Sequence, residues 1–119
     1  MPTIILHDAG NMKIAEVTGD GVLLRNADDA RNLLMQSHRA EWIAVHEKNI
    51  DPKFFDLRSG IAGDVLQKFV NYRTCFAILG DVTRYTEKSE ALASLVRESN
   101  RGKDVRFVAT LEALISCVA

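Results

Sequence analysis

The 119-residue sequence is poor in cysteine, proline and aromatic residues, and it contains no long apolar run. Its two cysteines, Cys75 and Cys117, stand far apart among apolar residues, as is typical of free intracellular thiols. Together with the three histidines they lack the spacing of zinc ligands, so no metal site is expected. No segment approaches the ~20 apolar residues that span a bilayer, and the N-terminal residues lack the pattern of a signal peptide. We therefore expect a cytoplasmic protein without a membrane partner.

The sequence also lacks a surplus of either charge. Its 15 basic and 16 acidic residues give a formal net charge of -1. Such a balance produces no long-range field that gathers phosphates, so nucleic acid is not expected as a partner. The length is that of one domain with one core, and we predict a single α/β domain over residues 1–119.

Segments with the character of strands and helices alternate along the chain. Residues 3–7 and 12–17 are rich in β-branched residues, and residues 8–11 between them have the composition of a hairpin turn. Residues 61–72 carry apolar side chains at three- and four-residue spacing, which predicts a helix with a wide buried stripe. Further strands are expected at 22–24, 42–45, 75–79 and 105–109, and further helices after the caps Asn26, Thr86 and Thr110.

This order of elements, β-β-(β)-α-β-α-β-α-β-α, predicts the fold class. It indicates a mixed sheet of four to five strands with about four helices packed against it. A flavodoxin-like or Rossmann-like three-layer arrangement is the alternative that the same order leaves open.

A loop that enters the helix at residue 61 holds the most informative polar residues. Asp56, Arg58, Ser59, Gly60 and Gly63 bring a carboxylate, a guanidinium, a hydroxyl and two glycines to a helix start. The free N–H groups there can hold an anion, and glycine permits close approach of a ligand. In the purely structural interpretation, Ser59 caps the helix, the glycines allow tight helix-to-sheet contact, and Asp56 pairs with Arg58. No Gly-Lys-Ser/Thr follows, so this is not a nucleotide-hydrolase phosphate loop.

A second candidate segment begins at Asp81, directly after the apolar strand at 75–79. Ligands of open α/β sheets collect beyond the carboxyl ends of strands, so Asp81, Arg84 and Tyr85 can form the lip of a pocket. The structural interpretation gives Asp81 a turn-forming role instead.

Two further polar groups are included as candidates. Gln67 and Asn71 lie four residues apart on one helix face, where they either face solvent or contact a bound partner. Asn100 and Arg101 make an unusually polar helix end, which in the structural interpretation is a C-cap.

Long strings of these residues resemble a known family. The strings Phe54–Arg73, Ala77–Asp81 and Glu98–Gly102 resemble the bacterial family called domain of unknown function 4180, and the resemblance covers nearly the whole chain. It implies membership without an activity, because the family has no established activity to carry over.

A more distant similarity suggests a mechanism. The order β-β-α-β-α-β, with Ser59, Gly60 and Ile61 opening a helix after Asp56, resembles sulfate-transporter and anti-sigma-antagonist (STAS) domains and SpoIIAA-like proteins. In those antagonists a serine at such a helix start accepts phosphate and switches partner binding. The resemblance implies this role for Ser59, although Leu57 and Arg58 interrupt the antagonists' motif.

Two classes of function follow from these observations. The first is a noncatalytic regulatory module that binds a protein partner or a small anionic ligand through residues 56–64 and 81–85, with no cofactor. The second is a small enzyme that uses Asp56, Asp81 or His46 as acid or base on an anionic substrate. A homodimer built on an exposed strand or helix face is a further hypothesis.

Overall fold

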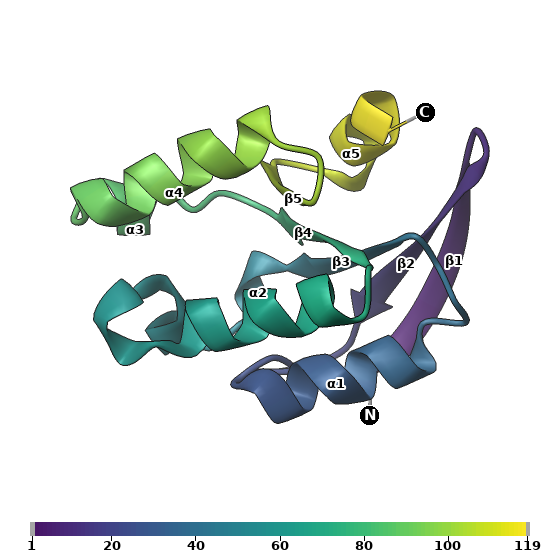
Figure 1. The fold of residues 1–119 in the computed structure, drawn as a ribbon, viewed down its shortest axis with the longest axis horizontal. Helices are drawn as coiled ribbons and strands as arrows, with labels where there is room; N and C mark the ends of the chain where they lie inside the picture. The colour runs from purple at the N-terminus through teal and green to yellow at the C-terminus, as the bar shows by residue number, and fades with distance from the viewer. Residues whose placement is uncertain (1, 119) are drawn as a thin grey trace.

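The computed structural model of the chain describes residues 2–118 (Figure 1). Three single-turn 3-10 helices, η1 (Glu47–Asn49), η2 (Pro52–Phe55) and η3 (Leu57–Ser59), lie between the third strand and the second α-helix. The strands and α-helices follow the chain in the order β1 (Thr3–Ala9), β2 (Met12–Thr18), α1 (Ala27–Gln36), β3 (Trp42–His46), α2 (Ile61–Asn71), β4 (Cys75–Leu79), α3 (Thr83–Thr86), α4 (Glu90–Arg101), β5 (Val105–Val108) and α5 (Leu111–Val118).

The strands form one mixed sheet in the order β1-β2-β3-β4-β5. The strands β1 and β2 make the predicted antiparallel hairpin, and β2 to β5 run parallel to one another. The predicted mixed α/β sheet is therefore confirmed. A doubly wound sheet reverses its strand order at a switch point. The strands of residues 2–118 follow the chain without such a reversal, so the flavodoxin-like or Rossmann-like alternative is wrong.

Local capping chemistry explains where the helices begin. The Asn26 side chain accepts a hydrogen bond from the Asp29 N–H at 3.0 Å, as predicted for the start of α1. The prediction that Thr86 caps the next long helix is wrong, because Thr86 ends the one-turn helix α3. The cap of α4 is Ser89, whose hydroxyl accepts from the Leu92 N–H at 3.1 Å.

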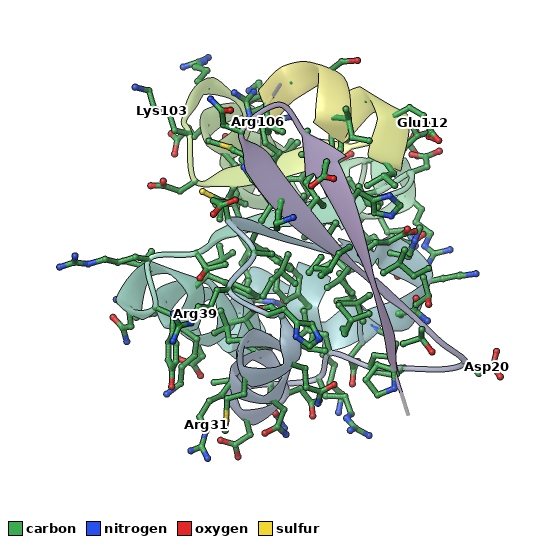
Figure 2. The ribbon with its side chains drawn as sticks, turned by 90° about the vertical axis from the view of Figure 1, so that its right-hand side faces the viewer. Asp20, Arg31, Arg39, Lys103, Arg106 and Glu112 are labelled. Carbon is green, nitrogen blue, oxygen red and sulfur yellow. The ribbon has the colours of Figure 1, made fainter. Side chains whose placement is uncertain are left out.

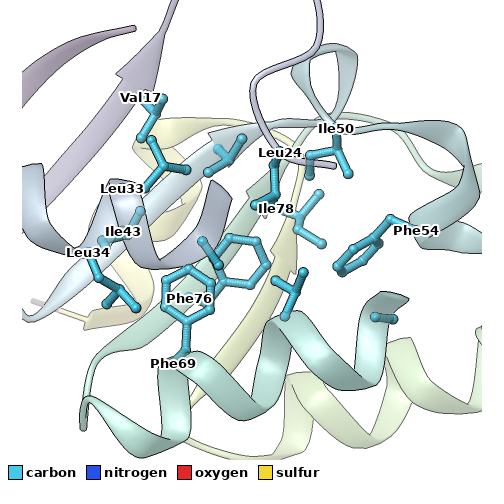
Figure 3. Packing of buried hydrophobic residues seen from close by; sticks show 14 of the residues in the cluster. Val17, Leu24, Leu33, Leu34, Ile43, Ile50, Phe54, Phe69, Phe76 and Ile78 are labelled. Atoms are coloured by element: carbon cyan, nitrogen blue, oxygen red, sulfur yellow. The ribbon is translucent and has the colours of Figure 1, made fainter. Parts of the chain in front are cut away.

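The larger core lies on the sheet face that α1, α2 and α4 cover (Figure 3). Phe69 of α2 stacks on Phe76 of β4, with ring centroids 4.3 Å apart. The predicted stripe of α2 explains this packing, because Ala62, Val65 and Phe69 recur on one helical face and are all buried. Among the residues of this core are Val17, Leu24, Leu33, Leu34, Ile43, Ile50, Phe54, Ile78 and Leu92.

A smaller core lies on the opposite face of the sheet, under α5. Leu114 of α5 is fully buried against a cluster that includes Ile14 and Trp42. This cluster explains why strands β3 and β4 are apolar on both faces. Cys75 borders it and is half-buried, and burial raises the pKa of its thiol. Cys117 is a free thiol that is exposed on α5.

The strand predicted at residues 22–24 is reduced to one bridge between Leu24 and Ile50. The buried residue Asn49 holds this segment instead. Its backbone carbonyl accepts from the Leu23 and Leu24 N–H groups, and its side-chain amide donates to the carbonyls of Gly19 and Gly21. The chain after β2 is thus fixed to the chain after β3, at the carboxyl edge of the parallel strands.

Candidate functional site

The two loops singled out from the sequence meet at one cavity. The 3-10 helices η2 and η3 precede α2, and α3 follows β4. In Figure 1 the segment of η2 and η3 and the segment of α3 lie at the left-hand end of the molecule. Between them is a cavity of about 550 Å³. The residues that line it are Pro52, Phe55, Asp56, Leu57, Arg58, Tyr85, Lys88, Ser89 and Ala91.

Aromatic stacking joins the two walls of this cavity. The rings of Phe55 and Tyr85 are stacked, with centroids 4.2 Å apart. The Arg84 guanidinium lies 4.7 Å from the centre of the Tyr85 ring and donates a hydrogen bond to the Tyr85 hydroxyl at 2.8 Å. Arg84 also forms an ion pair with Glu47, at 2.8 Å, just after β3. These contacts fix the α3 segment against the loop that precedes α2.

Asp56 and Arg58 form an exposed pair at the mouth of the cavity. The Arg58 Nε lies 3.1 Å from the Asp56 carboxylate, as the structural interpretation of the sequence predicts. The Asp56 carboxylate also accepts the Arg58 backbone N–H. The side-chain hydrogen bond from Arg58 is the main cause that lowers the Asp56 pKa. Asp56 is therefore a fixed anion, and the exposed Arg58 guanidinium keeps donors free for other acceptors.

Ser59 and Gly60 shape the entry to α2. The helix begins at Ile61, and Gly60 is its N-cap with φ 79°, so the prediction that Ser59 is the N-cap is wrong. A left-handed backbone at this position favours glycine. The Ser59 hydroxyl lies 2.7 Å from the Asp56 carbonyl oxygen and 2.8 Å from that of Lys53, and it accepts from the Ile61 N–H. Ser59 thus stabilises the turn from within.

The other candidates on α2 lie on its exposed face. Gln67 donates a hydrogen bond to Asn71 at 2.9 Å, and both residues are exposed. A Cβ added at Gly63 would meet nothing within 4 Å, so the expected tight helix-to-sheet contact at this glycine is absent. The cavity lining does not include these three residues.

Asp81 has the turn-forming role that the structural interpretation gives it. Its carboxylate accepts hydrogen bonds from both the side-chain hydroxyl and the backbone N–H of Thr83. The bond from the Thr83 hydroxyl is the main cause that lowers the Asp81 pKa. Gly80 precedes it with φ 128°, and a Cβ there would lie 3.0 Å from the Glu47 Cβ. The strand end at β4 is therefore packed closely against the strand end at β3.

Asn100 and Arg101 lie away from the cavity, at the end of α4. The Asn100 amide accepts from the Phe107 N–H at 2.8 Å and donates to the Phe107 carbonyl at 3.2 Å. It therefore bonds β5 as a neighbouring strand would. Arg106 donates to the Asn100 carbonyl at 2.6 Å, while Arg101 is exposed.

A cluster that sequence reasoning missed lies on the sheet face opposite the larger core. The Glu16 carboxylate bonds His7 Nε2 at 2.9 Å through one oxygen and His46 Nε2 at 2.7 Å through the other. The Glu16 side chain is 14% exposed. Partial burial acts to raise its pKa, but the hydrogen bonds from His46 and His7 outweigh it and lower the pKa. A charged residue within the apolar strand at 12–17 was the available signal, but its partners depend on strand register.

Residues 2–118 contain neither a cluster of metal-ligating side chains nor a helix that could span a membrane. This part of the chain has no group of three or more His, Cys, Asp or Glu side chains that could hold a metal ion. Glu16, His7 and His46 form a hydrogen-bonded network. Over the same residues, every helix is too short or too polar to cross a membrane.

The fold and this cavity define a small α/β domain with a ligand-sized hollow at one end of a mixed sheet. A family model described as domain of unknown function (DUF4180) matches residues 9–118. The chain belongs to this family, as the three strings of residues had indicated. Neither the curated proteins nor the solved structures include a match to the chain. The similarity to STAS domains therefore stays a prediction.

Proposed function

We propose that this chain is a noncatalytic binding module that holds a small anionic ligand in the cavity between η2–η3 and α3–α4. The observation that carries the proposal is the cavity itself. Both loops selected from the sequence contribute to its lining, and the positive side chains of Arg58 and Lys88 line it together. With Asp56 as the acidic lining residue, the charged lining has a net charge of +1 (two cations minus one anion).

The shape and chemistry of the cavity favour a ligand with two different ends. Phe55, Leu57 and Tyr85 offer apolar and aromatic surface. Ser89 and Ala91, at the amino end of α4, also line the cavity, and the helix dipole favours negative charge there. A phosphate or carboxylate attached to an apolar group therefore matches both parts of the lining.

The properties of the carboxylates support binding over catalysis. A general acid or base works best with a pKa near the operating pH. Both Asp56 and Asp81 instead have lowered pKa values and are exposed. The strand alternation turns His46 to the face of Trp42, the face opposite the larger core, where it bonds Glu16. These groups do not converge on one reaction centre, so the enzyme hypothesis is the weaker of the two.

Phosphorylation of Ser59 would be a regulatory form of the same proposal. The residue is exposed and follows Arg58 directly. A phosphate there would add about -1.5 to -2 charges, which would pair with Arg58 and compete with an anionic ligand. The hydroxyl would first have to release the carbonyls of Lys53 and Asp56, so the modification would also loosen the turn. Intact-mass analysis of the protein from its own host, followed by peptide mapping of any phosphate, tests whether this serine carries it.

An NMR titration with phenyl phosphate tests the binding proposal. Phenyl phosphate should shift backbone amide signals of residues 55–58 and 88–91, and phenol at the same concentrations should shift them far less. Lys88→Gln should weaken phenyl phosphate binding by about fivefold, the equivalent of ~1 kcal/mol. The matched control is Lys103→Gln, an exposed lysine outside the cavity lining. Signal changes elsewhere, or equal effects of the two substitutions, would contradict the proposal.

A further inference from the structure

The outer edge of β1 is an open strand edge with apolar side chains. The strand stands at one end of the sheet order and pairs with β2 alone among the strands of residues 2–118. Ile5 and Leu6 of β1 are 42% and 44% exposed. Figure 2 shows the β1–β2 hairpin in front of the other strands. Unprotected edges of this kind template pairing with another strand.

The other edge of the sheet is protected. The strand β5 stands at the opposite end of the sheet order. The side chain of Asn100 takes both the N–H and the carbonyl of Phe107, so the position where a further strand would bond is occupied. Arg106 ties the same strand to the end of α4. The β5 edge is therefore blocked by a side chain, whereas the outer edge of β1 has backbone groups that can pair with another strand.

The hairpin turn determines which backbone groups of β1 face outward. A two-residue turn, Gly10 and Asn11, joins Ala9 to its partner Met12. In such a hairpin the closing pair exchanges both hydrogen bonds, and every second pair does the same. Residues 3, 5, 7 and 9 therefore bond β2. The N–H and carbonyl groups of Ile4, Leu6 and Asp8 point away from it.

We propose that a second copy of this chain pairs with β1 in antiparallel orientation, with the two-fold axis at Leu6. This register aligns all seven residues of β1 with those of the second copy and brings the two Leu6 side chains together. It also places Asp8 opposite Ile4 of the second copy, so the two carboxylates are not juxtaposed. The net charge of -1 on each chain adds little repulsion. A strand edge complements itself under two-fold symmetry, which makes a second copy the matching occupant.

The resulting assembly is closed and independent of the proposed ligand. Because Asn100 blocks β5, pairing at β1 joins two sheets into one ten-stranded sheet (five strands from each copy) and stops there. The β1 edge and the cavity lining share no residue. The proposed ligand binding and the proposed dimerisation can therefore be tested independently, and one can be disproved without the other.

Sedimentation equilibrium over a range of protein concentrations tests the pairing. The wild-type chain should be a dimer, and Leu6→Lys should raise the dimer dissociation constant at least about tenfold. The matched control is Met35→Lys, which alters another exposed apolar residue, 70% exposed on α1. Circular dichroism checks that both variants are folded. A monomeric wild-type chain, or equal dissociation constants for the two variants, would overturn the proposal.

Cysteine cross-linking tests the register. In a hydrogen-bonded antiparallel pair the Cα atoms lie about 5.5 Å apart, which suits a disulfide. In a Cys117→Ser background, Leu6→Cys should form a covalent dimer under mild oxidation, and Ile5→Cys should not, because Ile5 faces His7 of the second copy. Met35→Cys is the control for random collision. Cross-linking at position 5 without cross-linking at position 6 would overturn the Leu6 axis.

Discussion

The ring of Tyr85 lies parallel to the ring of Phe55, with an interplanar angle of 9°. Tyr85 thereby covers Phe55, which is only 3% exposed, and joins the loop after β4 to the loop before α2. Tyr85→Ala should lower the free energy of unfolding by about 1–3 kcal/mol, because the stack and its buried area are lost. Urea denaturation measures this change. Tyr72→Ala, at a tyrosine that is 49% exposed, is the control and should change little.

Two glycines should respond in opposite directions to the same substitution. Gly80→Ala should destabilise the fold by about 1–3 kcal/mol, because φ is 128° and the new Cβ would lie 3.0 Å from the Glu47 Cβ. Gly63→Ala should stabilise it by about 0.5–1 kcal/mol, because the site is helical and open. Thermal and urea unfolding of the two variants decide the question. Destabilisation by Gly63→Ala would show that the glycine has a role in packing.

Glu16 should contribute to the pH dependence of stability. Its pKa is lowered in the folded chain, so its contribution is present above the unfolded pKa near 4.5 and is lost as the pH falls through the folded value. The free energy of unfolding of the wild-type chain should therefore fall more steeply below pH 5 than that of Glu16→Gln. Urea unfolding between about pH 3 and 7 measures both slopes.

A control substitution must show that the effect on acid stability is specific to Glu16. Glu112→Gln is the matched control, because Glu112 is exposed on α5 and makes no ion pair within residues 2–118. The Glu112→Gln profile should follow the wild-type profile. If Glu16→Gln also followed it, the network with His7 and His46 would contribute nothing to acid stability.

Ser59 should prove to be a residue of the turn. Ser59→Ala removes the hydroxyl that bonds the carbonyls of Lys53 and Asp56, and it should cost about 1 kcal/mol of unfolding free energy. Phenyl phosphate affinity should fall with it only as far as the turn loosens. A variant as stable as the wild type would indicate that Ser59 is free for another role.

Asn100→Ala should destabilise the edge of β5. It leaves the Phe107 N–H and carbonyl without their partner, at a residue that is only 8% exposed, and it should cost about 1–3 kcal/mol. Arg101→Ala alters the next, exposed residue and should change stability little. Hydrogen exchange of the Phe107 amide should accelerate in Asn100→Ala alone.

Periodicity predicted most of the fold. The stripe of Ala62, Val65 and Phe69 predicted α2, and the apolar run at 75–79 predicted a strand covered on both faces. These signals are local, so one chain is enough to detect them. The ends of the helices were harder to predict than their existence. Thr86 and Ser89 are both good caps, and the choice between them depends on how α3 packs rather than on residue type.

The site was predictable only as a set of segments. Residues 56–64 and 81–85 were selected because polar groups follow a strand or enter a helix, and position in the chain is enough to detect this. That Tyr85 stacks on Phe55 depends on the packing of α3, and that Glu16 contacts both His7 and His46 depends on the register of three strands. A shift of one residue in either register would turn these side chains to opposite faces.

The strand order has a consequence for how the chain folds. Each strand lies beside its neighbour in sequence, so during synthesis each new unit can add to a sheet that already exists. The exception is α5, which follows all five strands in the sequence and covers Ile14 of β2 and Trp42 of β3. Until α5 docks, this apolar face is exposed to water, so a nascent or C-terminally truncated chain would be prone to aggregate through it.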